Sequence, residues 1–343
     1  MRTALTSLAA GAVALALTVA LAGCSGDGVN HTVAPTATIP SGLSVEGYVV
    51  ASSAAVAGYE KSKAAIDLVG VDGVTLTAGG AGVTPSSETA NAVRTAAQKG
   101  GAKAELLVAN FDDTTSDFSG ELASAMLNDE QNRQLVIAGL AAEVVNGGWD
   151  GVQLDFESLP GAVAPSLTAF ASELRATLPA TATISMAVQA ATTPEGYAAL
   201  GYDLQGLGDS VDRFVLMAYD QHGAGFSEPG AVGGLPWTTR AVEALVTLVP
   251  AAKVDLGVAN YGYQWTGEGK AGAAVTVAQA RKAAQSTGRW DDSEQEYTAS
   301  PPDGSTIWWS DGRSITARAE LAKEKGLHGV AIWQLTTGDP VRR

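Results

Sequence analysis

The sequence predicts a (β/α)8 barrel, that is, a TIM barrel, with a small insertion between the seventh and eighth strands. Three observations support this fold class. The chain has 343 residues, enough for one domain of this size. Short, nearly continuously apolar runs alternate with helical patterns, as in a parallel sheet with both faces covered. These runs number eight, the strand count of such a barrel. An open doubly wound sheet is the alternative, but no GxGxxG or P-loop motif supports a nucleotide-binding version.

The first residues are expected to be a targeting segment. Residues 1–23 combine Arg2 with an apolar run of small residues, which is the pattern of a secretory signal peptide. The segment Leu21–Cys24 resembles a bacterial lipobox, in which the signal is cut before the cysteine and the thiol is acylated. We therefore expect residues 1–23 to be a lipoprotein signal peptide and Cys24 to be the lipidation site. A plain signal peptide with a coincidental cysteine is the alternative.

A flexible tether is expected over residues 24–44. Its central part, 25–41, is rich in Gly, Pro, Ser and Thr and has almost no charge. The folded domain is then predicted over 45–340. Such an arrangement would place a secreted, lipid-anchored protein on the outer face of the cell membrane, since several acyl chains give stable anchoring.

The predicted strands and helices follow one another in order through the domain. The strands are predicted at 45–51, 71–78, 104–111, 151–156, 183–188, 213–219, 254–260 and 329–335. The helices are predicted at 88–99, 129–146, 165–178, 237–248 and 315–325. The helix predicted at 129–146, just before the fourth strand, has an acidic first turn and stops at Gly147-Gly148. The polar, tryptophan-rich segment 266–311 is expected to be the insertion, and it could form one wall of the barrel mouth.

Composition excludes several partners. The formal net charge is −15 and the pI is about 4.6, which argues against nucleic acid, because phosphates require stripes of Lys and Arg. Cys24 is the only cysteine, so neither a disulfide framework nor a thiolate metal cluster is expected. The three histidines, His31, His222 and His328, do not follow a ligand spacing. We therefore expect no metal and no other cofactor, and we expect a monomer.

Polar side chains on the fourth predicted strand are the first functional signal. Gln153, Asp155 and Glu157 alternate with apolar residues, so a strand directs all three to one face. Burying two carboxylates and an amide on one face is costly without a purpose. In such barrels the chemistry lies at the carboxyl ends of the strands. Other polar and aromatic residues predicted at these ends are Tyr219, Asp220, Asn260, Tyr261, Trp333 and Gln334. A ring of acids, amides and aromatics is typical of sugar binding.

Four motifs carry a specific resemblance. Asp150–Glu157 (DGVQLDFE) resembles the fourth-strand signature Asp-Gly-x-Asp-x-Asp-x-Glu of glycoside hydrolase family 18, the chitinase-like hydrolases. Met217–Asp220 (MAYD) resembles the sixth-strand Met-x-Tyr-Asp of that family. The segments 257–265 and 329–333 resemble its seventh and eighth strands. The stretch 308–322 resembles the branch that acts on bacterial cell walls and spore cortex.

The resemblance implies a glycosidase that cleaves β-linked N-acetylhexosamine polymers, either peptidoglycan or chitin-like. Asp155 and Glu157 lie about 6–7 Å apart along one strand and cannot easily flank a sugar, which favours a substrate-assisted retaining route. In that route Glu157 protonates the glycosidic oxygen, Asp155 orients the acetamide and Tyr219 hydrogen-bonds its carbonyl. The substrate-binding residues implied by the motifs are Gln153, Asp220, Trp333, Met217, Asn260 and Tyr261.

Gln153 departs from the family signature, which has Asp at this position. A carboxylate there would repel Asp155 and raise its pKa, whereas an amide could donate a hydrogen bond that keeps Asp155 ionised. We expect this change to tune activity rather than abolish it, because Glu157 is intact. The alternative is a catalytically weak or inactive lectin-like lipoprotein that binds the N-acetylated glycan. A solute-binding lipoprotein is disfavoured by the barrel pattern and by the lack of a two-lobed repeat.

Overall fold

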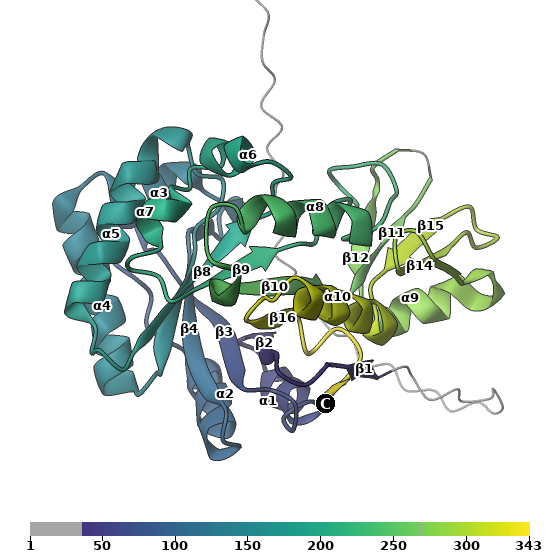
Figure 1. Ribbon diagram of the computed structural model, residues 1–343, viewed down its shortest axis with the longest axis horizontal. Coiled ribbons are helices and arrows are strands. Elements are labelled where there is room, and N and C mark those ends of the chain that lie inside the picture. The colour runs from purple at the N-terminus through teal and green to yellow at the C-terminus, as the bar shows by residue number, and fades with distance from the viewer. Residues whose placement is uncertain (1–35, 268) are drawn as a thin grey trace, which may run out of the picture.

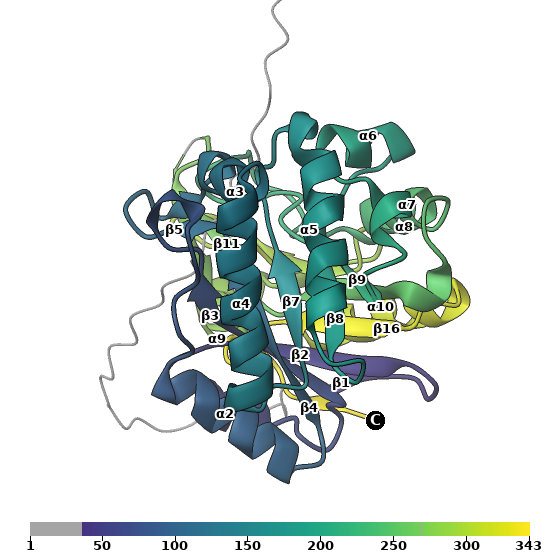
Figure 2. The same ribbon diagram turned by 90° about the vertical axis from the view of Figure 1, so that its left-hand side faces the viewer.

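The computed structural model describes residues 36–267 and 269–343, which form a closed barrel of eight parallel strands covered by helices (Figures 1 and 2). This confirms the predicted fold class. Around the barrel the strands are β10 (Val254–Ala259), β16 (Gly329–Trp333), β2 (Ser44–Val50), β3 (Leu68–Thr75), β4 (Lys103–Ala109), β7 (Gly151–Asp155), β8 (Thr183–Gln189) and β9 (Arg213–Met217). The second predicted strand, 71–78, lies at 68–75, because a short 3-10 turn at Ala78–Gly80 with two positive-φ glycines ends the strand early.

The predicted helices are all present. They are α2 (Glu88–Lys99), α4 (Glu130–Gly147), α5 (Ala164–Thr177), α8 (Leu235–Leu245) and α10 (Gly312–Glu324). Side-chain caps fix where they begin: Ser87 accepts a hydrogen bond from the Ala90 N–H, and Asp129 accepts one from the Asn132 N–H. Shorter helices escaped prediction because they span too few turns to show a period. They are α1 (Ala55–Glu60), α3 (Gly120–Leu127), α6 (Pro194–Ala199) and α7 (Leu204–Leu207).

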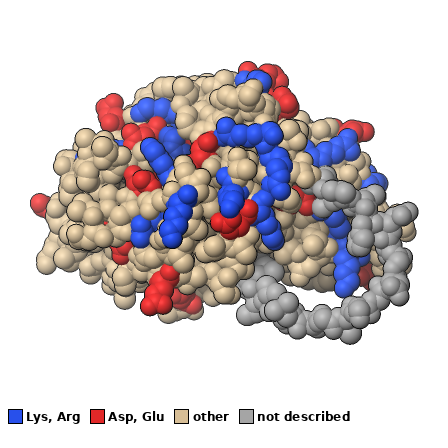
Figure 3. Space-filling model, turned by 90° about the horizontal axis from the view of Figure 1, so that it is seen from below, with Lys and Arg blue, Asp and Glu red and all other residues tan. Residues whose placement is uncertain are grey.

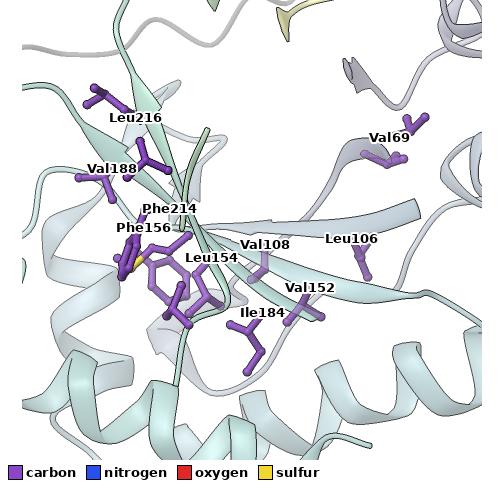
Figure 4. Packing of buried hydrophobic residues seen from close by; sticks show 14 of the residues in the cluster. Val69, Leu106, Val108, Val152, Leu154, Phe156, Ile184, Val188, Phe214 and Leu216 are labelled. Atoms are coloured by element: carbon purple, nitrogen blue, oxygen red, sulfur yellow. The ribbon is translucent and has the colours of Figure 1, made fainter. Parts of the chain in front are cut away.

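The main hydrophobic core lies between the outward faces of the strands and the surrounding helices. Figure 4 shows Val108, Leu154 and Phe214 among its fully buried side chains. Phe156 packs against Phe170 of α5, with 5.9 Å between the ring centroids. The inward faces of the same strands are left for a separate interior set of side chains, and that set builds the site.

The insertion is a five-stranded antiparallel sheet that lies to the right in Figure 1. Its strands, in spatial order, are β12 (Gly272–Val275), β11 (Gly262–Trp265), β15 (Thr306–Trp309), β14 (Glu296–Ala299) and β13 (Arg289–Asp291). Helix α9 (Val277–Ala284) packs on this sheet. The insertion between the seventh and eighth barrel strands is therefore confirmed, and its first strand begins at Gly262, a few residues before the predicted start.

The end of the predicted tether belongs to the folded domain. β1 (Ala37–Thr38) pairs in parallel with β17 (Val341–Arg342), and Ala37 and Ile39 are buried against the barrel. Apolar burial thus fixes the chain from residue 37 onward, earlier than the predicted boundary at 45. Residues 1–35, with the predicted signal peptide and Cys24, lie outside the described part of the chain. Among the helices that are described, none has the length and apolarity needed to cross a membrane.

Candidate active site

Strand β7 positions the two central carboxyls at the mouth of the barrel. Asp155 is its last residue and Glu157 follows two positions later, with exposed fractions of 8% and 4%. The backbone of Glu157 is held on both sides by Asn110, whose Oδ1 accepts from the Glu157 N–H at 2.9 Å and whose Nδ2 donates to the Glu157 carbonyl at 2.9 Å. Ser158 then turns the chain with a φ of 56°. The segment that follows β7 is therefore fixed by hydrogen bonds from the residue that follows β4.

The Glu157 side chain is prepared to act as an acid. Gln189, the last residue of β8, donates from Nε2 to Oε2 of Glu157 at 2.9 Å. Burial raises the pKa of Glu157 well above its usual range, and the carboxyls of Asp155, Asp220 and Asp117 raise it further. Burial therefore favours the protonated form of this carboxyl, and the hydrogen bond from Gln189 involves Oε2 and not Oε1.

The Asp155 carboxyl is also perturbed. Burial, together with the charge of Asp72 on β3, raises the pKa of Asp155 to about 8. Its Oδ1 atom is buried and has no hydrogen-bond partner among the described residues. Because an unsatisfied buried polar atom costs free energy, this oxygen is suited to bind a polar group of a ligand.

Gln153 does not have the role that its position suggested. The side chain is fully buried below Asp155, and its Nε2 donates to Oγ of Ser185 at 2.9 Å and to Oε1 of Glu46 at 3.5 Å. It donates no hydrogen bond to Asp155, and the pKa of Asp155 is raised rather than lowered. The expected hydrogen bond to Asp155 is therefore not formed, because Ser185 and Glu46 bind the amide in the barrel interior. The substrate contact of Gln153 stays a prediction.

The residues after β9 form a linked set of acids and phenols. Tyr219 and Asp220 are half-buried, and Asp220 has a φ of 58°. The hydroxyls of Tyr261 and Tyr263 both donate to Oδ1 of Asp220, the second at 2.9 Å. Burial raises the pKa of Asp220, and these two hydrogen bonds oppose that rise. Tyr261 therefore acts on the site through Asp220, since its own side chain is only 4% exposed.

Aromatic rings close the barrel interior beneath this mouth. Trp333, at the end of β16, is half-buried and packs against Tyr48 of β2 with 5.5 Å between centroids. Phe111 and Phe118, from the hairpin of β5 (Phe111–Asp112) and β6 (Asp117–Phe118), join the same cluster. Met217 ends β9 and is half-buried as well. These apolar surfaces lie beside the carboxyls, as a sugar ring requires.

Asn260 is not part of this mouth. Its side chain is fully buried, where Nδ2 donates to the Asp339 carbonyl at 3.0 Å and Oδ1 accepts from the Asp339 N–H at 3.0 Å. The amide ties the end of β10 to the segment after β16. The substrate contact predicted for Asn260 stays a prediction, and in this structure backbone groups bind both ends of its amide.

The sequence reasoning missed three residues that shape the site: Asn110, Gln189 and Asp72. Asn110 and Gln189 each lie at the carboxyl end of a barrel strand, as Asp155 does. Asp72 lies within a predicted strand and shares its inward face with Gly70. Counting alternate inward positions along each strand would have found Gln189 and Asp72, whereas Asn110 directly follows the inward Ala109 and lies outside that alternation.

The mouth is acidic. Seven of the eight segments that follow barrel strands contain no Lys or Arg: 51–54, 76–87, 110–119, 156–163, 190–193, 218–234 and 334–340. The acids in these segments are Asp112, Asp113, Asp117, Glu157, Asp220, Glu228 and Asp339. Lys and Arg side chains gather instead on the face seen from below, away from α3 and α6 (Figures 1 and 3). Within the described ranges, no group of three or more His, Cys, Asp or Glu residues has a metal-binding arrangement.

A (β/α)8 barrel with a buried acid carboxyl, a second carboxyl beside it and aromatic rings below them has the site of a glycosidase. The sequence agrees with this class. Residues 91–338 match the family described as Glycosyl hydrolases family 18, and the chain belongs to that family.

Known relatives extend the comparison. The chain is 31% identical over 236 residues to the putative sporulation-specific glycosylase YdhD of Bacillus subtilis (strain 168). This match covers 66% of this chain and 56% of the relative. It is 28% identical over 237 residues to the cortical fragment-lytic enzyme of the same organism, covering 65% and 55%. The chain thus spans about half the length of these curated relatives.

Solved structures share the fold. The Bacillus cereus spore cortex-lytic enzyme SleL matches with a TM-score of 0.78 at 20% identity, over 89% of this chain and 72% of that one. A chitinase from Chromobacterium violaceum matches with a TM-score of 0.78 at 24% identity, over 87% and 95%. At these identities the likeness concerns the fold alone.

Proposed function

We propose that this protein hydrolyses β-linked N-acetylhexosamine polymers, peptidoglycan or chitin-like, by substrate-assisted catalysis with retention of configuration. One observation carries the proposal: Glu157 is buried at the mouth, with a raised pKa, beside Asp155, whose buried Oδ1 has no partner among the described residues. Asp155 ends β7 and Glu157 follows two residues later, so the two carboxyls lie on the same side of a bound sugar and cannot flank it.

The proposed reaction has two halves. Glu157 donates its proton to the glycosidic oxygen as the bond from that oxygen to the anomeric carbon breaks, and the acetamide carbonyl oxygen of the same sugar bonds to that carbon. In the second half the Glu157 carboxylate takes a proton from a water molecule, whose oxygen displaces the acetamide. Asp155 binds the acetamide N–H and stabilises the oxazolinium cation between the two halves. The Tyr219 hydroxyl hydrogen-bonds the acetamide oxygen.

The relatives support two polymers. The cortical fragment-lytic enzyme and the sporulation-specific glycosylase favour a cell-wall glycan, whereas chitotriosidase-1 of Mus musculus, 26% identical over 279 residues, favours a chitin-like chain. An intact Glu157 gives the lectin-like alternative no support. We also propose that the protein is anchored through Cys24 on the outer face of the cell membrane and acts there as a monomer, where the anchor keeps the enzyme close to the wall.

Product analysis tests the function. Residues 36–343 and the Glu157→Gln variant would be incubated with purified peptidoglycan and, separately, with chitooligosaccharides, and the products read by mass spectrometry. Loss of a general acid costs a factor of about 10² to 10⁴ in rate. New reducing ends from one polymer, absent with the variant, support the proposal and name the polymer. Glycan binding without products from either polymer contradicts it.

A further inference from the structure

Inward side chains of a (β/α)8 barrel stack in layers contributed by alternate strands, so strand register reveals which residues share a height. Here the lowest charged layer calibrates the count. Glu46 on β2 is in register with Leu68 on β3, which is in register with Lys103 on β4. Yet Glu46 and Glu105 both bind Arg213, at 3.1 and 3.0 Å. Glu105 is two residues after Lys103. A residue on one strand therefore shares its layer with the residue that lies two positions after its registered partner on the next strand but one.

The same count places Asp72 and Asp155 in one layer. Asp72 of β3 is in register with Leu107 of β4, and Leu107 is in register with Gln153 of β7. Two residues beyond Gln153 is Asp155. The two carboxyls therefore belong to the same layer of the interior, directly under the mouth.

Asp72 points into the barrel. Gly70, two residues earlier, faces the interior, since a Cβ atom there would lie 2.3 Å from the Tyr48 ring. The register shifts between Asp72 and Val74, and Val74 returns to the core outside the strands. This β-bulge at Gly73 ends the regular alternation just after Asp72, as bulges beside functional sites commonly do.

The two carboxyls lack a nearby cation. The buried guanidinium of the barrel interior, Arg213, lies in the lowest layers and is bound by Glu46, Glu105 and Asp255. None of the described residues donates a hydrogen bond to the Asp72 side chain. Asp155 is buried and Asp72 is half-buried, and ionising both carboxyls in one layer is costly because like charges repel.

We propose that Asp72 is a positioning residue of this site, a second carboxyl that shares one proton with Asp155 across the top layer of the barrel. The family signature has an Asp two residues before Asp155, where this chain has Gln153. Asp72 supplies the carboxyl that is missing at that position. The second carboxyl is thus on β3 and not on β7, and the Gln153 amide binds Ser185 and Glu46.

The direction of the pKa shifts at both carboxyls agrees with this geometry. Burial raises the pKa of Asp72 to about 6, and the charge of Asp72 adds to burial in raising the pKa of Asp155 to about 8. Tyrosine hydroxyls with raised pKa values stay neutral in this range and do not compete for the proton. The ionisable groups that interact with Asp155 from the other packed elements are Tyr202, Glu157 and Tyr219.

NMR titration of the Asp155 carboxyl tests this proposal. In protein labelled with ¹³C at aspartate carboxyls, the Asp155 signal is assigned with Asp155→Asn and titrated in wild type, in Asp72→Asn and in Asp72→Glu. We expect Asp72→Asn to lower the midpoint of Asp155 by about one pH unit or more, and Asp72→Glu to restore it. Asp72→Ser gives the same reading if the amide variant fails to fold. Asp113→Asn, on an exposed loop, is the matched control.

An unchanged Asp155 midpoint in folded Asp72→Asn protein overturns the inference. The inference rests on the proposed function for its catalytic meaning, and kcat/KM profiles on chitooligosaccharides supply that second readout. The inflection that follows Asp155 should shift with the NMR midpoint in Asp72→Asn. Because the titration needs no substrate, a protein that cleaves no glycan refutes the proposed function while the NMR result still decides the role of Asp72.

Discussion

The side-chain amide of Gln189 donates a 2.9 Å hydrogen bond to Oε2 of Glu157, and so one oxygen of the acid is occupied before substrate arrives. This bond fixes the plane of the carboxyl and leaves Oε1 to carry the proton. It also favours the ionised form, against the larger effect of burial. The residue at the end of β8 therefore orients the catalytic group and moderates the rise in its pKa.

Replacing Gln189 by Leu should lower kcat about 10- to 100-fold, since a misplaced acid loses its near-attack geometry. The basic limb of the kcat profile should move to higher pH, because the hydrogen bond that lowers the pKa of Glu157 is gone. Rates measured against pH on a chitooligosaccharide check both effects. Gln205→Leu, on the exposed side of α7, is the control, and an unmoved basic limb in Gln189→Leu would contradict this role.

Asn110→Ala should destabilise the fold and reduce activity together. The change leaves the buried N–H and carbonyl of Glu157 without partners, each costing about 1–3 kcal/mol. Urea unfolding of the variant should show this loss, and Asn146→Ala, at an exposed position of α4, should not. Wild-type stability of Asn110→Ala would show that Asn110 does not hold the end of β7.

Asp155→Asn should make the protein more stable at neutral pH. The pKa of Asp155 is about 8 in the folded protein and about 4 in the unfolded chain. Because the folded value is higher, the stability contributed by the protonated carboxyl is complete below about pH 4 and declines as the pH rises toward 8. An amide has no such dependence, so the variant should gain on the order of 2–4 kcal/mol at pH 7 and nothing near pH 4.

Unfolding by urea at several pH values measures this difference. Asp72→Asn should show a smaller gain of the same sign, because the pKa of Asp72 is raised only to about 6. A gain in Asp155→Asn that persists unchanged at pH 4 would point to packing instead of ionisation.

The acidic mouth should discriminate among glycans by charge. With no Lys or Arg in seven of the segments that follow barrel strands, a chain carrying carboxylates is repelled during approach. We expect kcat/KM to be about 10-fold or more higher for neutral N-acetylated oligosaccharides than for carboxylate-bearing ones of equal length, and this ratio should shrink at high salt. If this ratio of kcat/KM values does not change with ionic strength, the selectivity comes from direct contacts with the glycan and not from repulsion during approach.

The sequence predicted the barrel well because each barrel strand is an apolar run bounded by turn residues. Motif order also identified Asp155, Glu157, Tyr219 and Trp333 as neighbours at one mouth, and the structure brings them together. Those inferences depend on alternation along single strands, which the sequence records directly.

The failures concern side chains whose partners come from distant strands. Gln153 was expected to serve Asp155, but Ser185 and Glu46, on two other strands, bind its amide. Asn260 directly follows its strand, β10, and the backbone of Asp339 binds its amide. Asp72 was missed because its importance comes from barrel register and not from local pattern.

The anomeric configuration of the first product tests the central claim most directly. The proton NMR spectrum recorded within the first turnovers on a chitooligosaccharide, or on the polymer that product analysis identifies, distinguishes the β anomer from the α anomer before mutarotation mixes them. Attack by the substrate's own acetamide, with Glu157 acting as acid and then as base, predicts the β anomer. The α anomer as the initial product would contradict this mechanism, because it requires a single displacement by water.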